Sequence, residues 1–129
     1  MFTPVTQALM EDGLIGSGHT VLDVATGPGE PALSIATVVG PEGKVIGVDP
    51  VPEMVAAAQR ATEDRGFKNT HFSLASADDL PFPADTFDSV VSRFSVMFFP
   101  SPEHGVREML RVLKPGGKTG PGGPASRRK

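Results

Sequence analysis

The sequence has 129 residues, of which 39% are hydrophobic and 21% are charged. That composition is typical of one globular domain and excludes a disordered chain or a coiled coil. It contains no cysteine, which excludes disulfide scaffolds, cysteine-ligated zinc and thiol catalysis. No apolar run approaches the roughly 20 residues of a membrane helix, and the first residues lack the pattern of a secretory signal. We therefore expect a cytoplasmic protein with no membrane span.

The charge is distributed unevenly along the chain. Twelve basic and 15 acidic residues give a net charge of −3. Four of the basic residues lie within the last twelve positions, which leaves the preceding body with a net charge of −7. An acidic body is poorly suited to the phosphate backbone, so we expect no nucleic-acid partner and a solvated basic end.

Strand and helix patterns alternate along the chain. Residues 2–14 predict a short amphipathic helix with Val5, Leu9 and Met10 on one side. Strands are then predicted at 20–25, 44–49, 70–74 and 88–96, and helices at 31–40, 52–65 and from 102, where Ser101 can cap the helix. This alternation predicts an α/β fold with a doubly wound, mainly parallel sheet.

The end of the chain has a different composition. Seven of the nine residues from Gly116 to Pro124 are glycine or proline, which disfavours both helix and strand. We therefore expect one domain over residues 1–118 and a disordered basic tail over 119–129.

A glycine turn and an acid carry the strongest functional pattern. The predicted strand at 20–25 runs into Gly27-Pro28-Gly29, and a helix follows. Such a turn lets a ligand lie against the backbone, with the helix N-terminus directed toward it. Asp49 ends the next strand, 22 residues after Gly27, where its carboxylate can accept hydrogen bonds from ribose hydroxyls. The combination predicts a nucleoside-bearing ligand, although a tight turn and a helix cap would look the same locally.

Two ligand classes fit this pattern. Residues 27–32 match the dinucleotide fingerprint G-x-G-x-x-G/A, which makes an NAD-binding domain one alternative. Asp23, inside the preceding strand, would repel a pyrophosphate but attract a cationic ligand such as S-adenosylmethionine. Asp23 can also simply hold the turn by accepting backbone N–H groups.

Four stretches of the chain resemble class I S-adenosylmethionine-dependent methyltransferases, in the branch of the ubiquinone/menaquinone biosynthesis enzymes. They are VLDVATGPGEPAL at 21–33, VIGVDPVPEMV at 45–55, ADDLPFPADTFDSVVSRF at 77–94 and MLRVLKPGGK at 109–118. The resemblance implies a Rossmann-like sheet, S-adenosylmethionine as cofactor, and in-line transfer of its methyl group to a small-molecule acceptor. It does not identify the acceptor.

The resemblance also implies roles for individual residues. The methionine part of the cofactor would lie against the turn after the first strand, namely Asp23, Ala25, Thr26, Gly27, Pro28 and Gly29. Asp49 would bind the ribose, and Arg93 and Phe94 would border the methyl group. The adenine would be surrounded by Pro50, Met54, Ser76, Ala77 and Asp78. Ser76 stands where the family often has an acid that accepts from the adenine amino group. A neutral acceptor there would weaken that hydrogen bond.

The sequence offers little for acid–base chemistry. His104, at the start of the last helix, is the one candidate general base, and a solvent-facing histidine would look the same. No metal-ligand spacing is present.

The last residues depart from the family pattern. Class I methyltransferases have seven strands in the order 3-2-1-4-5-7-6, and TGPGGPASRRK stands where the fifth should follow. We therefore expect a truncated domain that lacks the last three strands and has the fourth as an open edge. An alternative to an active enzyme is then an impaired cofactor-binding fragment that self-associates through its fourth strand.

Overall fold

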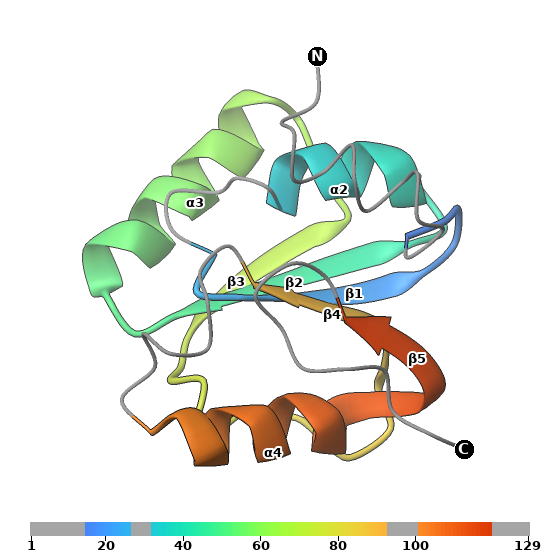
Figure 1. Cartoon of the computed structure of the whole chain (residues 1–129). Coiled ribbons are helices and arrows are strands. Elements are labelled where there is room, and N and C mark those ends of the chain that lie inside the picture. The colour runs from blue at the N-terminus through green and yellow to red at the C-terminus, as the bar shows by residue number, and fades with distance from the viewer. Residues whose placement is uncertain (1–14, 27–31, 93–100, 120–129) are drawn as a thin grey trace.

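The computed structural model describes residues 15–26, 32–92 and 101–119 (Figure 1). In chain order, the elements are β1 (Thr20–Val24), α2 (Ala32–Val39), β2 (Lys44–Asp49), α3 (Pro52–Asp64), β3 (Thr70–Leu74), β4 (Phe87–Ser92), α4 (Pro102–Val112) and β5 (Leu113–Thr119). The alternation of strand and helix predicted for residues 20–112 is thereby confirmed. The predicted helix at 2–14 lies outside the described residues.

The five strands form one sheet in the order β3-β2-β1-β4-β5, and every neighbouring pair is parallel. The register pairs Asp23 of β1 with Gly47 of β2 and Val91 of β4, while Asp49 at the end of β2 pairs with Leu74 of β3. The predicted α/β fold with a parallel sheet is confirmed, and the strand order places the carboxyl ends of β1 and β2 side by side.

Helices cover both faces of the sheet. Figure 1 shows α2 and α3 on one face and α4 on the other. Each face has its own buried cluster, because side chains of successive strand residues point to opposite sides. Val21, Val45 and Phe72 pack with α2 and α3. On the α4 side the core consists of Leu22, Val24, Val48, Ala77, Leu80, Phe87, Val90, Met109, Val112 and Leu113.

The prediction that the fifth strand is missing, which followed from the glycine and proline content near the end of the chain, is wrong. β5 runs parallel to β4, with a register irregularity between Phe87 and Ser89. Two glycines allow β5 to approach β4 closely. Gly116 has φ +80°, and a Cβ on Gly117 would lie 2.7 Å from Leu113 Cδ1 and 2.9 Å from the Asp88 carbonyl oxygen of β4. Glycine in a strand often marks such a site, so composition alone was misleading.

The fifth strand also changes the edges of the sheet. β4 lies between β1 and β5, so the expectation that β4 is an open edge is wrong. Among the described strands, β3 and β5 are the outer ones. The association with a second copy that we expected through β4 therefore loses its basis, because β4 is paired on both sides.

Asp88 connects the start of β4 to both neighbouring strands. Its Oδ2 accepts from the Thr20 N–H of β1 at 2.8 Å, and its Oδ1 pairs with Lys114 Nζ of β5 at 3.2 Å. Partial burial would raise the pKa of Asp88, but the Thr20 and Lys114 interactions outweigh it and place the pKa below its ordinary value. The carboxylate thus stays charged where it fastens the three strands.

Within the described part of the chain, every helix is too short or too polar to cross a bilayer.

Candidate functional site

The carboxyl ends of the parallel strands bring the predicted acids to one edge of the sheet. Asp23 lies one residue before the end of β1 and is fully buried, and Asp49 is the last residue of β2 and is 6% exposed. Alternation along the strands places both on the α2/α3 face, because Val21 and Val45 pack there. In open α/β sheets, ligands bind outside this edge.

Asp23 holds the turn that follows β1. Its Oδ2 accepts a hydrogen bond from the Thr26 hydroxyl at 2.7 Å, and Thr26 is itself fully buried. The Thr26 N–H donates to the Val48 carbonyl oxygen of β2 at 2.9 Å, which extends the pairing of the two strands past the end of β1. Asp23 thus holds the turn through the Thr26 hydroxyl. The backbone N–H bonds expected from the glycine loop would involve residues outside the described ones, and that role stays a prediction.

Gly47 provides the space for this arrangement. A Cβ at Gly47 would lie 2.6 Å from Cδ1 of Phe72, 2.8 Å from its Cε1 and 2.9 Å from the Thr26 hydroxyl oxygen. Contacts below 3.0 Å force a neighbour to move, and Phe72 is packed in the core. The sequence analysis missed Gly47, although a glycine inside a strand often marks such a close approach.

Ala25 adopts a conformation unusual for a residue with a Cβ. Its φ is +61°, in the left-handed region that favours glycine. The turn after β1 therefore carries backbone strain next to the glycines at 27 and 29, and such strain often accompanies ligand-binding turns.

Asp49 links the end of β2 to the start of α3. Its Oδ1 accepts a hydrogen bond from the Val51 N–H at 2.9 Å, one residue before the helix begins at Pro52. Its carbonyl oxygen accepts from the Ala75 N–H at 3.1 Å. Asp49 is therefore fixed on both sides, and the chain after β3 lies directly beside it.

The residues after β3 form a tight turn next to Asp49. The Asp79 N–H donates to the Ser76 carbonyl oxygen at 3.1 Å, and the same two residues form an isolated antiparallel bridge. The Ser76 hydroxyl donates to the Asp78 carboxylate, and Ala77 is buried. Ser76, Ala77 and Asp78, predicted together from the sequence, lie in one turn that begins next to Asp49, and the Asp78 carboxylate accepts from the Ser76 hydroxyl.

Two exposed apolar side chains flank the same acid. Val51 is 41% exposed and Leu74 is 59% exposed, and both exceed the exposure usual for large hydrophobic residues. Val51 follows Asp49 by two residues, and Leu74 pairs with Asp49 across the sheet. The sequence analysis missed both, because exposure cannot be read from a pattern of buried strands. Together with Asp49 they can receive a flat, largely apolar group with a polar edge.

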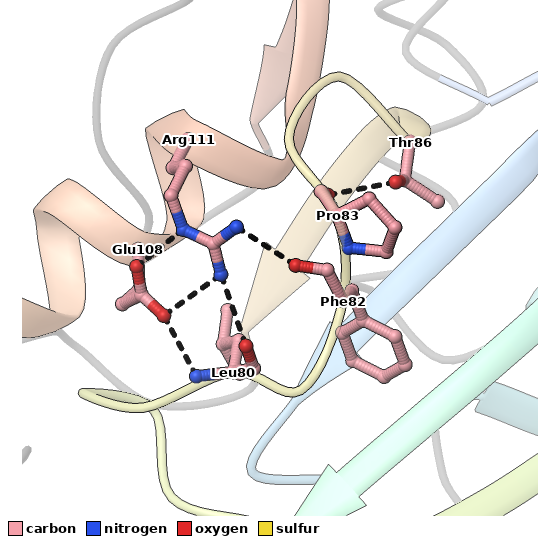
Figure 2. A network of polar contacts seen from close by, with 6 residues as sticks. All are labelled: Leu80, Phe82, Pro83, Thr86, Glu108 and Arg111. Atoms are coloured by element: carbon pink, nitrogen blue, oxygen red, sulfur yellow. Dashed lines mark hydrogen bonds and ion pairs between the residues drawn. The ribbon is translucent and has the colours of Figure 1, made fainter.

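Helix α4 holds the loop that leads from the Ser76–Asp79 turn into β4 (Figure 2). Arg111 donates from its two terminal nitrogens to the carbonyl oxygens of Phe82 at 2.8 Å and Leu80 at 2.9 Å. Glu108 accepts from the Leu80 N–H at 2.8 Å and pairs with Arg111 Nε at 2.6 Å. We call these two side chains the α4 clamp.

The ion pair within the α4 clamp affects both of its members. The hydrogen bond from Arg111 lowers the pKa of Glu108 most strongly, partial burial opposes it, and the Leu80 N–H adds to the lowering. The same bond raises the pKa of Arg111, with a smaller contribution from the charge of Asp79. Both clamp residues are therefore charged near neutral pH.

His104 lies in the first turn of α4 and is exposed. Its Nδ1 lies 3.0 Å from the hydroxyl oxygen of Ser101. Ser101 occupies the predicted N-cap position, but its side chain makes no capping bond to the helix backbone. The predicted cap is therefore wrong in its chemistry, because the hydroxyl interacts with the histidine.

The remaining predicted site residues differ in what the structure describes. Pro50 is exposed directly after Asp49, and Met54 is half-buried in the first turn of α3. Outside the described residues lie Gly27, Pro28, Gly29, Arg93 and Phe94. No cluster of three metal-ligating side chains occurs within residues 15–26, 32–92 and 101–119.

A separate cavity of about 710 Å³ opens near the amino ends of the strands, opposite the two acids. It lies between the C-terminal ends of α2 and α3 and is lined by Ala36, Thr37, Gly40, Pro41, Gly66, Phe67, Lys68 and Asn69. None of the predicted site residues lines it. The Asn69 amide spans part of this region by donating to the carbonyl oxygens of Ala36 and Gly40.

Comparison with known sequences identifies relatives of the chain. The "Uncharacterized methyltransferase YcgJ" of Bacillus subtilis is 38% identical over 100 residues, which cover 78% of this chain and 38% of that protein. The ubiquinone/menaquinone biosynthesis C-methyltransferase UbiE of Pseudomonas putida is 39% identical over 105 residues, covering 81% of this chain and 41% of UbiE. The chain thus spans about two fifths of the length of these curated relatives.

A solved structure and a family model agree with these relatives. The structure of an S-adenosylmethionine-dependent methyltransferase from Aquifex aeolicus superposes with a TM-score of 0.83 at 32% identity, covering 90% of this chain and 61% of that one. The family model for the methyltransferase domain matches residues 21–117, which contain both acids, the glycine turn and the α4 clamp. This chain therefore belongs to the methyltransferase-domain family.

Proposed function

We propose that this chain binds S-adenosylmethionine at the carboxyl edge of its sheet and serves the transfer of the cofactor's methyl group to a small molecule. The observation that carries the proposal is the placement of two buried acids, Asp23 and Asp49, at the ends of adjacent parallel strands, beside exposed apolar side chains. The membership in the methyltransferase family supports the same ligand.

Asp49 is proposed to bind the ribose of the cofactor. A carboxylate at the end of the second strand can accept hydrogen bonds from two vicinal hydroxyls, and charge-assisted bonds of this kind are stronger than neutral ones. The bond from the Val51 N–H to Oδ1 orients the carboxylate before any ligand arrives. Little side-chain entropy is then lost on binding.

The adenine is proposed to lie near Val51 and Leu74, with the Ser76–Asp79 turn at its edge. The two apolar side chains provide contact area for a flat ring. The Asp78 carboxylate, held by the Ser76 hydroxyl, is the acceptor we assign to the adenine amino group. The buried Ala77 places its peptide at the same turn, where its N–H can reach a ring nitrogen.

Asp23 is proposed to favour the cationic part of the cofactor. A carboxylate in a buried position generates a strong local potential, because the surrounding dielectric is low. That potential favours a sulfonium and an ammonium group and disfavours a pyrophosphate. Through Thr26, Asp23 also fixes the turn that leads into the glycines at 27 and 29, which we assign to the methionine part.

When bound, the cofactor supplies an activated methyl group on its sulfonium, so the protein mainly contributes position and, for some acceptors, a base. His104 is our candidate for that base. If its Nδ1 donates to Ser101, then Nε2 is the nitrogen able to accept a proton. We propose a small molecule as the methyl acceptor.

Calorimetric titration of the folded chain with S-adenosylhomocysteine and with NAD tests the proposed ligand. We expect saturable binding of S-adenosylhomocysteine, and NAD binding at least about a hundredfold weaker, because its pyrophosphate would approach Asp23. A circular dichroism melt of the same sample establishes that it is folded. NAD binding as tight as S-adenosylhomocysteine binding, or no heat with the latter, would refute the proposal.

A further inference from the structure

Hydrogen bonds hold the backbone on both sides of the Ser76–Asp79 turn. On one side, the Ala75 N–H is bonded to the Asp49 carbonyl oxygen at 3.1 Å. On the other side is Leu80, whose N–H donates to Glu108 and whose carbonyl oxygen accepts from Arg111. Both polar groups of the Leu80 backbone are therefore held by side chains of α4.

The α4 clamp also holds the chain beyond Leu80. Arg111 reaches the Phe82 carbonyl oxygen at 2.8 Å, and the Arg111 carbonyl oxygen accepts from the Asp85 N–H at 2.9 Å. Phe82 packs edge-to-face on Phe87 of β4, with ring centroids 5.2 Å apart. Figure 2 shows the guanidinium between α4 and this loop, with Glu108 between Arg111 and Leu80.

The geometry of the clamp depends on both the charge and the shape of its members. The guanidinium donates to two backbone carbonyls and to Glu108 at once, a fork that an ammonium group cannot reproduce. Glu108 accepts from Arg111 and from the Leu80 N–H with its carboxylate. Loss of either member would release Leu80 and, with it, one end of the turn.

We propose that Glu108 and Arg111 are positioning residues for adenine recognition: they fix the Ser76–Asp79 turn so that Asp78 and the Ala77 peptide can distinguish an amino-bearing purine from an oxo-bearing one. This inference rests on the proposed function, which places adenine at that turn. The clamp residues act on the base through the turn and the loop backbone that they hold.

The test compares two ligands that differ only at the base: S-adenosylhomocysteine and S-inosylhomocysteine, in which a carbonyl replaces the amino group. For the unmodified chain we expect at least about a tenfold preference for the adenine ligand, because the inosyl ligand lacks the amino group for Asp78 and its protonated N1 cannot accept from the Ala77 N–H. In Arg111→Lys and in Glu108→Gln, we expect the preference to fall below about threefold, mainly through weaker binding of the adenine ligand.

Lys114→Met provides the matched control. It removes an ion pair of the same sheet, between β5 and Asp88, without touching the clamp. We expect its preference between the two ligands to equal that of the unmodified chain. The ratio of the two affinities is the decisive quantity, because partial unfolding of a variant weakens both ligands by the same factor.

Each outcome separates the two proposals. If the unmodified chain does not bind S-adenosylhomocysteine, the proposed function itself fails. If it binds but shows no preference between the ligands, or if both clamp variants keep the full preference, then the positioning role is refuted while the cofactor assignment stands.

Discussion

Replacing Asp49 by alanine is expected to weaken the binding of S-adenosylhomocysteine at least about a hundredfold. The change removes two charge-assisted hydrogen bonds to the ribose hydroxyls, each contributing roughly 1.5–3 kcal/mol. It also removes the acceptor of the Val51 N–H, a hydrogen bond that contributes about 1 kcal/mol just before α3. Titration calorimetry well below the melting temperature measures the first effect separately from the second.

Two comparisons isolate the ribose contacts. Asp49→Asn keeps an oxygen for Val51 and one acceptor for the ribose, so we expect an intermediate loss of about tenfold. A 2′,3′-dideoxy analogue of S-adenosylhomocysteine should bind the unmodified chain and Asp49→Ala with similar affinities, since its sugar offers nothing to the carboxylate. Less than a threefold loss in Asp49→Ala with the intact ligand would contradict the assignment of Asp49.

Gly47→Ala is expected to destabilise the fold by about 2–3 kcal/mol, because the added methyl group overpacks a filled core. The new Cβ would lie 2.6 Å from the Phe72 ring and 2.9 Å from the Thr26 hydroxyl oxygen. The melting temperature should fall by roughly 10 °C for a domain of this size. Thermal and urea unfolding, followed by circular dichroism, measure the change.

A second glycine serves as the control for this substitution. The three atoms nearest to a Cβ at Gly16 would belong to the His19 ring, at 3.5 Å or more, so Gly16→Ala should change stability by less than about 1 kcal/mol. Combining Gly47→Ala with Phe72→Leu should restore part of the loss, since the shorter side chain leaves room for the methyl group. If Gly47→Ala melts at the same temperature as the unmodified chain, the close packing around Thr26 is wrong.

The sequence predicted the position of several elements well. β2 and β3 begin and end at the predicted residues, and α3 ends one residue before its predicted end. The apolar run of β2 and the proline that opens α3 are strong local signals of this architecture. β5 was missed because its glycines are required by a close approach to β4, a tertiary cause that composition does not reveal.

The candidate site was only partly predictable. Asp23 and Asp49 were found because strand ends and acids are visible in a sequence, and parallel pairing brings them to one edge. Gly47 was missed because its role depends on Phe72, 25 residues away in the chain. The α4 clamp was missed for a similar reason, because its partners are backbone groups of a loop, which carry no sequence signal.

The most direct measurement is an amide chemical-shift map of the chain titrated with S-adenosylhomocysteine. We predict that the largest shifts occur at Thr26, Val51 and Ala77, which lie at the carboxyl ends of β1, β2 and β3. The amides of Gly40, Gly66 and Asn69, around the cavity near the amino ends of the strands, should stay unchanged. Shifts centred on those three residues, with none at the strand ends, would contradict the account.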